Sequence, residues 1–501
     1  MKKLLLILLL VLAGEISAQQ AATIVVKTTP DNEIAYWPTG KEHLFCIALG
    51  TKAQAGPLGE FVHQFRTDRP GMVQVWTQGS DSFTLYLTPG SKDTITVTKD
   101  TLIISGTNSA YNRCLKTVND YQKYSDKLVY MQPHELRGIT SLEQYHRLAD
   151  ARMRQALDAV NASGLNEEFL AEQRAHIDYI RRSIFIHIAR QLSRKEKLPE
   201  DWQRELTEVI NSSVNGDYLR SYRGIGFFVN DLVMMQFTNL ENGDLKEIKD
   251  YASFLFDRYR KFFTGDNLQY MQAQLIYEDE FQGSKTPSIP QLYETYRAEF
   301  PNSPFLNVLE PGVKENLRFQ NSRITDKDYH ILTCDSTITS LEDAVKPFKG
   351  KVVYIDVWAT WCGPCLKEFQ YLPALKEKAH NMDVVYLYIS IDRPEERKKW
   401  EKTIAYHQLK GYHLLVNEKL GKSLYTELGN ERQILSIPCF VIIDKTGKIV
   451  IRHAAAPSEP EKNRLRNKLI KKRKTGKSLT SAKKKSIFAY VIIKYIPIKV
   501  R

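Results

Sequence analysis

The sequence predicts a multidomain protein in which an N-terminal antiparallel β domain and a middle α-helical region precede a C-terminal α/β domain. Its 501 residues are enough for two or three domains. The pattern of apolar residues also changes twice along the chain, from short strand-like runs to long amphipathic stretches and then to an alternation of strands and helices. These changes place the three regions at residues 19–109, 110–322 and 323–474.

The first 18 residues have the three parts of a secretory signal peptide. Met1-Lys2-Lys3 is positively charged, residues 4–13 are apolar, and Ile16-Ser17-Ala18 offers small residues for cleavage. The apolar run is shorter than the roughly 20 residues that span a bilayer, and an uncleaved anchor is the alternative. We expect residues 1–18 to be cleaved and the mature protein to work in the periplasm or cell envelope.

Short runs of β-branched and aromatic residues dominate the first region, and turn clusters such as Pro89-Gly90-Ser91 separate them. We therefore expect a small antiparallel sandwich or barrel. The predicted strands include residues 24–26, 45–49, 72–76, 83–87, 94–97 and 102–104.

The middle region carries apolar residues at three- and four-residue spacing with charged residues between them, which is typical of amphipathic helices. Its many aromatic residues fit either a core between helices or a ligand cleft, and core packing is the commoner reason for such a pattern. The predicted helices include residues 142–162, 167–192, 202–211 and 248–263.

The third region alternates between strand and helix patterns, which predicts a mixed sheet flanked by helices. Its apolar runs are bounded by turn residues, as buried strands are. The predicted strands span residues 352–358, 383–391, 439–444 and 449–451, with a helix at 397–406 and a hairpin turn at 445–448.

The pentapeptide Trp361-Cys362-Gly363-Pro364-Cys365 lies between the first of these strands and an amphipathic stretch. A strand, a tight turn and a helix with two cysteines at the junction form the geometry of a thioredoxin-type redox site. The first sulfur is then at the helix N-terminus, where unpaired backbone N–H groups stabilise a thiolate, and the second lies one turn deeper. We predict a redox-active Cys362–Cys365 disulfide, with no other cofactor and no metal.

Two other interpretations of the cysteine pair are half of a zinc site and a structural disulfide. A zinc site needs a second pair of ligands, and the chain contains no other CxxC and no HxxxH pattern. A structural disulfide does not account for the preceding strand, the tryptophan or the turn. The redox interpretation is therefore favoured.

Several segments of the C-terminal region, together with the pentapeptide, match the sequence motifs of a known family. They are Gly350-Lys351-Val352-Val353, Asp356-Val357-Trp358-Ala359-Thr360 directly before the pentapeptide, Ile437-Pro438, and the run from Phe440 to Gly447. With them the region resembles the TlpA/ResA-like family of extracytoplasmic thiol-disulfide oxidoreductases. The resemblance implies a thioredoxin-like fold for residues 323–474. Residues 83–112 resemble the accessory β-domain that precedes such redox domains in long bacterial envelope proteins.

The resemblance also implies a role for four residues. Cys362 corresponds to the attacking cysteine and Cys365 to the resolving one. Asp356 corresponds to a buried carboxylate that takes a proton from the resolving thiol, and Glu368 to an acidic residue near the dithiol with a similar proposed role. The alternatives are that Asp356 is a satisfied buried polar residue and that Glu368 lies on a solvated helix face.

We assign substrate binding to Trp361, Ile437 and Pro438. Ile437-Pro438 corresponds to the family's cis-proline loop, which faces the active-site sulfurs and binds extended substrate. Cys439 follows this loop, so we expect its sulfur within a side chain's reach of Cys362 but not in a stable bridge; a buried cysteine without a redox role is the favoured interpretation. Sequence alone pairs none of the other three cysteines, Cys46, Cys114 and Cys334.

The net charge of +13 resides in the C-terminal end of the chain. Residues 459–501 contain 15 Lys or Arg and two acidic residues, so the rest of the chain is neutral. The high pI therefore gives no reason to expect nucleic-acid binding. The basic tail at residues 475–501 is either a disordered extension, which is the favoured interpretation, or a segment that contacts an anionic membrane surface.

The implied activity is thiol-disulfide exchange, with reduction of protein disulfides as the favoured direction. A Gly-Pro dipeptide between the cysteines, as in thioredoxin, favours a reducing potential of about −270 mV. Disulfide isomerisation or oxidation is one alternative. Another is that the first two regions bind a client or a glycan and the redox domain is auxiliary. An enzyme of this kind requires disulfide-bearing protein clients and a membrane thiol electron donor as partners.

Overall fold

The structure is a computed structural model, and it describes residues 21–39, 44, 51–79, 82–98, 101–130, 139, 141–193, 197–212, 225–325, 327–380 and 382–458. The predicted signal peptide, the predicted strand at residues 45–49 with Cys46, and the basic tail lie outside these residues. Within the described ranges, no helix is both long enough and apolar enough to cross a membrane.

The chain divides into two compact units. One contains the chain up to Gln282 together with Thr286–Val313, and the other contains Gly283–Lys285 and the chain from Lys314 onward. The division lies close to residue 323, where the sequence predicts the start of the redox domain. The β-rich and helical regions fall into the same unit, so their separation at residue 110 remains a prediction.

The β-rich part of the first unit is a sandwich of two four-stranded sheets, with the strand orders β4-β1-β7-β8 and β3-β2-β5-β6. Apolar side chains from both sheets meet between them, among them Ile24, Val75, Leu85 and Ile95. The strands are β1 (Ala21–Lys27), β2 (Glu33–Thr39), β3 (Thr51–Gln54), β4 (Glu60–Arg66), β5 (Gly71–Thr77), β6 (Phe83–Leu87), β7 (Lys92–Val97) and β8 (Leu102–Gly106).

The prediction of a purely antiparallel arrangement is wrong at one position, because β1 and β7 pair in parallel. The remaining strand pairs of the sandwich are antiparallel among the described residues. Parallel neighbours need a long crossover connection, and here the intervening strands of both sheets supply it. A pattern of short runs and turns does not contain this information.

The helical part of the first unit follows the predicted spans closely for three of the four helices. The fourth, predicted over residues 248–263, is an α-helix only over Tyr251–Arg258, because the Asp250 carboxylate accepts a hydrogen bond from Ser253 N (2.8 Å) and caps the helix there. The helices are α2 (Ser109–Tyr130), α3 (Leu142–Asn161), α4 (Glu167–Ser193), α5 (Glu200–Asn211), α6 (Ile225–Met235), α7 (Tyr251–Arg258), α8 (Gly265–Gln282), α9 (Ile289–Glu299) and α10 (Leu306–Asn321), which runs into the second unit.

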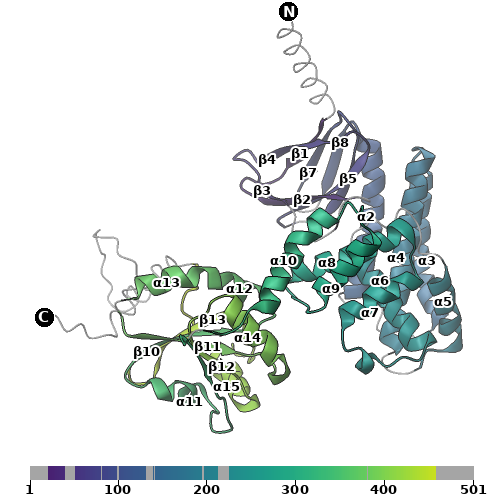
Figure 1. Ribbon diagram of the computed structural model, residues 1–501. Helices are drawn as coiled ribbons and strands as arrows, with labels where there is room; N and C mark the ends of the chain where they lie inside the picture. The colour runs from purple at the N-terminus through teal and green to yellow at the C-terminus, as the bar shows by residue number, and fades with distance from the viewer. Residues whose placement is uncertain are drawn as a thin grey trace, which may run out of the picture. The chain divides into compact units, whose positions relative to one another are not determined.

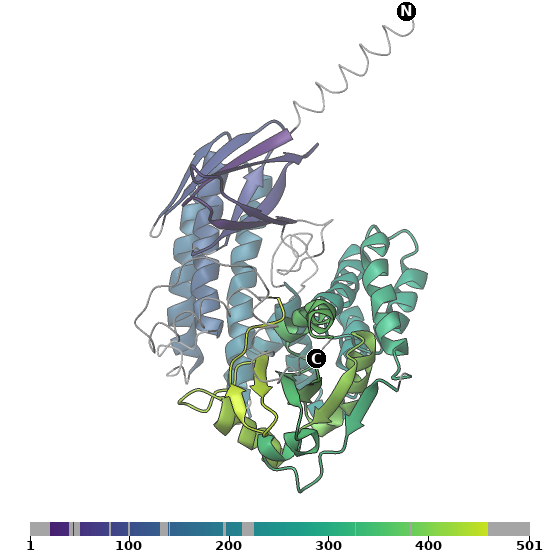
Figure 2. The same ribbon diagram turned by 90° about the vertical axis from the view of Figure 1, so that its left-hand side faces the viewer.

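Helices of the first unit lie next to the sandwich (Figures 1 and 2). Aromatic side chains fill the helical core and join it to the sandwich. Trp202, Phe256 and Phe263 are buried within it, which favours the core interpretation over a ligand cleft. At the junction, Tyr86 of β6 stacks on Tyr111 of α2 at 4.8 Å between ring centroids. The sandwich and the first helix of the bundle are therefore packed together.

The second unit is a six-stranded mixed sheet with the order β14-β13-β10-β11-β12-β9. The central strand β10 pairs in parallel with β11 and antiparallel with β13. Sequence analysis anticipated β10, β11, β13 and β14 but not β9 or β12. The strands are β9 (Tyr329–Leu332), β10 (Val352–Trp358), β11 (Val384–Ser390), β12 (Gly411–Leu415), β13 (Cys439–Ile443) and β14 (Ile449–Ile451).

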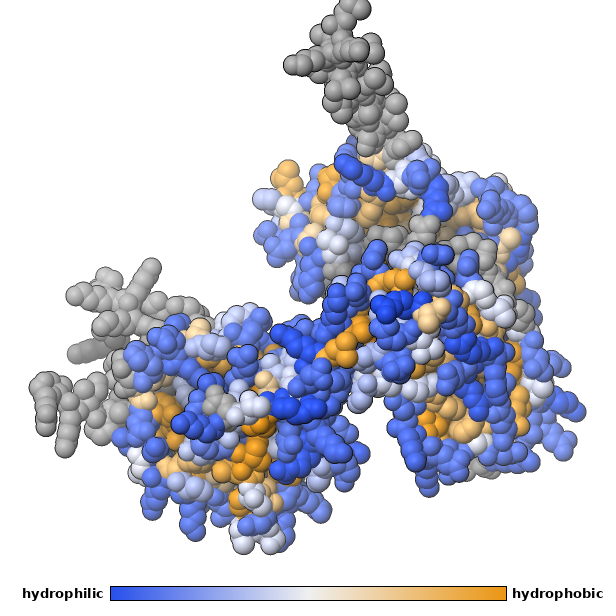
Figure 3. Space-filling view, in the orientation of Figure 1, coloured by the Kyte–Doolittle hydropathy of each residue, from blue (hydrophilic) through white to orange (hydrophobic). Residues whose placement is uncertain are grey.

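Helices cover both faces of this sheet (Figure 1). Val353, Ile355 and Val357 of β10 pack against α11 and α15, whereas Tyr354 and Trp358 pack on the opposite face against the other three helices. The surface visible in Figure 3 is mostly hydrophilic, as expected when the apolar side chains face inward. The helices are α11 (Leu341–Val345), α12 (Gly363–Glu368), α13 (Leu372–Lys378), α14 (Arg397–Tyr406) and α15 (Glu418–Leu428).

Gly411 allows β12 to lie against β11, and its replacement tests this packing. Its φ of +138° disfavours other residues, and an added Cβ would lie 2.8 Å from the carbonyl oxygen of Tyr386. We expect Gly411→Ala to lower the free energy of unfolding by about 1–3 kcal/mol, measured by urea denaturation. Gly421→Ala is the matched control, because in α15 the new Cβ has only an ordinary contact at 3.7 Å, and we expect a gain of about 0.5–1 kcal/mol. Equal effects of the two substitutions would contradict this account.

Candidate active site

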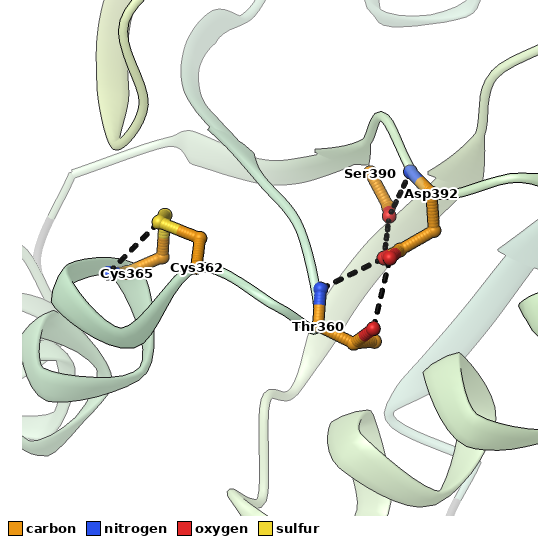
Figure 4. The surroundings of a disulfide bond; sticks show 5 residues. All are labelled: Thr360, Cys362, Cys365, Ser390 and Asp392. Atoms are coloured by element: carbon orange, nitrogen blue, oxygen red, sulfur yellow. Dashed lines mark hydrogen bonds between the residues drawn. A yellow bond between two sulfur atoms is a disulfide. The ribbon is translucent and has the colours of Figure 1, made fainter. Parts of the chain in front are cut away.

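The two cysteines of the pentapeptide lie where β10 gives way to α12. Cys362 is the N-cap residue of α12, and Cys365 lies in its first turn. The two form a disulfide with 5.2 Å between their α-carbons (Figure 4). The Cys365 N–H donates a hydrogen bond to the Cys362 sulfur at 3.2 Å. This donor stays in place after reduction if the backbone does, and it then stabilises a thiolate on Cys362.

Asp356 lies inside the sheet on the same face as the dithiol. It is a residue of β10, between Tyr354 and Trp358 of that face, and only 1% of its surface is exposed. Neither of its carboxyl oxygens has a hydrogen-bond partner. Burial raises the pKa of Asp356 well above its usual range, and the charge of Glu368 adds to this effect. The alternative that Asp356 is a satisfied buried polar residue gains no support from its protein contacts.

Glu368 is the last residue of α12, one helical turn after Cys365. Its carboxylate accepts two hydrogen bonds from Ser458, one from the backbone N–H at 2.9 Å and one from the hydroxyl at 2.7 Å. The side chain is half-buried. The interpretation of Glu368 as part of a solvated helix face thus gains no support.

The three residues assigned to substrate binding lie around the end of the sheet that carries the dithiol. The Ile437–Pro438 peptide bond is cis, as the resemblance implies. β13 begins directly after it, and Cys439 pairs with Val357 near the end of β10. Because the two strands are antiparallel, the loop before β13 and the loop after β10 lie at the same end of the sheet. Trp361 is 64% exposed there, as a client contact requires.

Cys439 is separated from the dithiol by the sheet itself. Its side chain packs with Val441 and Ile443 in the core under α11 and α15, whereas Cys362 and Cys365 belong to the core on the other face. Its sulfur contacts His453 Nδ1 at 3.6 Å, and it forms no disulfide. Burial raises the pKa of the Cys439 thiol to about 11, with a smaller effect of Asp356. These observations favour a buried cysteine without a redox role over the expected proximity to Cys362.

A polar cluster that sequence analysis missed fixes the loop before the dithiol (Figure 4). The buried Asp392 carboxylate accepts hydrogen bonds from the Thr360 backbone N–H at 2.9 Å, the Thr360 hydroxyl at 2.8 Å and the Ser390 hydroxyl at 2.5 Å. Thr360 lies two residues before Cys362, and Asp392 follows the end of β11. The one available signal was a pair of polar residues at the carboxyl end of a predicted buried strand.

Comparisons with known proteins agree with this geometry. Residues 332–469 match the family model described as Redoxin. The C-terminal part of the chain therefore contains a Redoxin domain. It is related to ResA-like thiol-disulfide oxidoreductases and has their thioredoxin-like fold.

Relatives with curated names match about a quarter of the chain. The chain is 29% identical over 116 residues to thiol-disulfide oxidoreductase ResA of Bacillus thuringiensis, a match that covers 23% of this chain and 62% of ResA. It is 27% identical over 135 residues to the thioredoxin-like protein YneN of Bacillus subtilis, which covers 27% of this chain and 72% of YneN. The chain thus spans less than two thirds of the length of the ResA relatives it matches.

One solved structure also has a similar sequence. A protein from Bacteroides vulgatus, assigned as a thiol-disulfide oxidoreductase, is 35% identical over 25% of this chain and 78% of its own length, with a TM-score of 0.21. The family match begins at residue 332, so the sandwich and the helices of the first unit lie outside it.

The N-cap position of Cys362 predicts a difference in reactivity between the two reduced thiols. Cys362 should be alkylated by iodoacetamide well below pH 8, because the Cys365 N–H stabilises its thiolate, and Cys365 should react far more slowly. Mass spectrometry of peptides after timed alkylation measures both rates. Cys439, buried and with a raised pKa, is the internal control for a slow thiol. Equal rates at Cys362 and Cys365 would show that Cys362 is not the nucleophile.

The raised pKa of Asp356 predicts how stability depends on pH. Between the pKa of an unfolded Asp, about 4, and the higher folded value, the native protein binds the extra proton, so its free energy of unfolding falls as pH rises. Asp356→Asn should remove this decrease, which amounts to about 1.4 kcal/mol for each unit by which the pKa is raised. Urea denaturation of the oxidised protein between pH 4 and 8 measures it.

Asp444→Asn is a control in which the free energy of unfolding should depend on pH in the opposite direction. The Thr446 hydroxyl holds the pKa of Asp444 below its usual range, so the contribution of this carboxylate is lost as pH falls. If Asp356→Asn leaves the pH dependence of stability unchanged, Asp356 is not a protonated buried carboxyl.

Proposed function

We propose that this protein is a dithiol–disulfide oxidoreductase that reduces disulfides of client proteins. The observation that carries the proposal is the joint placement of a Cys362–Cys365 disulfide at the start of α12 and an unpartnered, buried Asp356 on the same face of the sheet. The Redoxin match and the ResA relatives support the same chemistry.

In the proposed reaction, the reduced Cys362 thiolate attacks one sulfur of the client disulfide. A mixed disulfide forms and the first client thiolate leaves. The ionised form of Asp356 then takes the proton of Cys365. The Cys365 thiolate attacks the Cys362 sulfur, which breaks the mixed disulfide, releases the second client thiolate and forms the enzyme disulfide. The raised pKa of Asp356 suits this step, because a carboxylate with a higher pKa is a stronger base.

Reduction is the direction we favour among thiol-disulfide exchanges. The Gly363-Pro364 dipeptide between the cysteines supports a potential near that of thioredoxin, about −270 mV, rather than the roughly −120 mV of a strong oxidant. Isomerisation or oxidation is the alternative, since partners and compartment also set direction. The predicted signal peptide supports a location in the periplasm or cell envelope, where a membrane thiol donor would reduce the protein again after each turnover.

Client contact in this proposal involves Trp361 and the Ile437–Pro438 loop. The exposed Trp361 ring lies directly before Cys362, and the loop lies at the same end of the sheet. An extended client segment at this end would bring its disulfide next to Cys362.

The proposal predicts the behaviour of four variants in an insulin-reduction assay with dithiothreitol as electron donor. Cys362→Ser should reduce turnover to the rate without protein, and Cys365→Ser should stop at the mixed disulfide and remain linked to its client. Asp356→Asn should slow turnover by about 10²-fold through loss of the proton acceptor. Cys439→Thr is the matched control and should retain the wild-type rate, because its thiol lies on the other face of the sheet. Wild-type turnover in Cys362→Ser would refute the proposal.

A further inference from the structure

Both carboxylate oxygens of Glu368 are bound by one distant residue, Ser458. The hydroxyl donates to Oε1 at 2.7 Å and the backbone N–H donates to Oε2 at 2.9 Å. Ninety residues separate the two partners along the chain. An ionised carboxylate is an acceptor at both oxygens, so this two-donor arrangement matches the charged form of Glu368.

The fold accounts for the presence of Ser458 at this site. After β14 the chain continues alongside β13, and the Ala454 N–H donates to the carbonyl of Phe440 at 2.8 Å. Phe440 is the direct neighbour of Asp356 across the β10–β13 pair. Ala454 and Ala456 then pack on the core that contains the dithiol. The segment thus starts beside Asp356 and reaches Glu368 at its end.

Glu368 lies near the dithiol and affects the pKa of Asp356. It lies three residues after Cys365, which places both side chains on neighbouring positions of one helix face. It is the last residue of α12, and the chain continues from it in helical conformation through residues 369–371 into α13. Among the charges around Asp356, Glu368 is the one that adds to the effect of burial on its pKa.

We propose that Ser458 is a positioning residue of the redox site, which holds the Glu368 carboxylate as a fixed, charged neighbour of Asp356. The two acidic residues then have different tasks. Glu368, with both oxygens occupied, is a stationary charge, and Asp356, with neither oxygen occupied, is the group that exchanges a proton with Cys365. This assignment deepens the proposed function, on which it rests, and it removes Glu368 from the list of proton acceptors.

The test follows the protonation of Asp356 directly in the oxidised full-length protein. Isotope-edited infrared spectroscopy records the carbonyl band of the protonated carboxyl as pH rises, and Asp356→Asn serves as the blank. Glu368→Gln should move the loss of this band to lower pH, because a negative neighbour is removed. Ser458→Ala should move it in the same direction by part of that shift, and Ser458→Thr, which keeps a hydroxyl, should restore the wild-type value.

Two comparisons separate positioning from a merely structural role. In the Glu368→Gln background, Ser458→Ala should cause no further shift, because the two residues act through one carboxylate. Ser423→Ala removes another serine–glutamate hydrogen bond, to Glu427 on α15, and should leave the Asp356 band unchanged.

Two results would overturn the inference. In the first, Glu368→Gln shifts the Asp356 band but Ser458→Ala does not. In the second, Ser458→Ala shifts the band equally in the wild-type protein and in the Glu368→Gln variant. These spectra need no turnover. They therefore test the positioning of Glu368 independently of the insulin assay, whose failure would refute the proposed function instead.

Discussion

Burial of β10 on both faces is the constraint on which the second unit depends. All seven residues of this strand are buried. The strand lies between β13 and β11 in the sheet, and it ends at the loop before the dithiol. An isolated charge is strongly disfavoured in such an environment. Asp356 nevertheless lies in this strand with no hydrogen-bond partner, and burial raises the pKa of its carboxyl well above the usual range.

The surroundings of the dithiol divide into rigid and reactive parts. Asp392 fixes the loop before Cys362 through Thr360, and Ser458 fixes the end of α12 through Glu368. In the proposed function, the reactive groups between these anchors are the two sulfurs and Asp356. Such a division suits disulfide exchange, because the sulfurs must return to the same geometry after each electron transfer while only protons and electrons move.

Much of the second unit could be predicted from its sequence because its strands are short apolar runs bounded by turn residues. β10, α14 and β14 have the predicted bounds. β12 was missed because Gly411-Tyr412-His413 does not form an apolar run; its place next to β11 depends on packing under α14 and on a glycine at a close backbone approach. In the first unit, the sequence pattern also did not predict the parallel pairing of β1 with β7, because tertiary contacts decide how strands that are distant in the sequence pair.

The site shows the same limit. The sequence by itself determined the redox chemistry, because two cysteines around Gly-Pro at a strand-to-helix junction are local features of the backbone. It also pointed to Asp356, which stands in the predicted strand. Only the tertiary structure decided that Cys439 lies across the sheet from the dithiol and that Ser458 reaches Glu368. The physical reason is that the face of a strand and the partner of a charge depend on contacts between segments that are far apart in the chain.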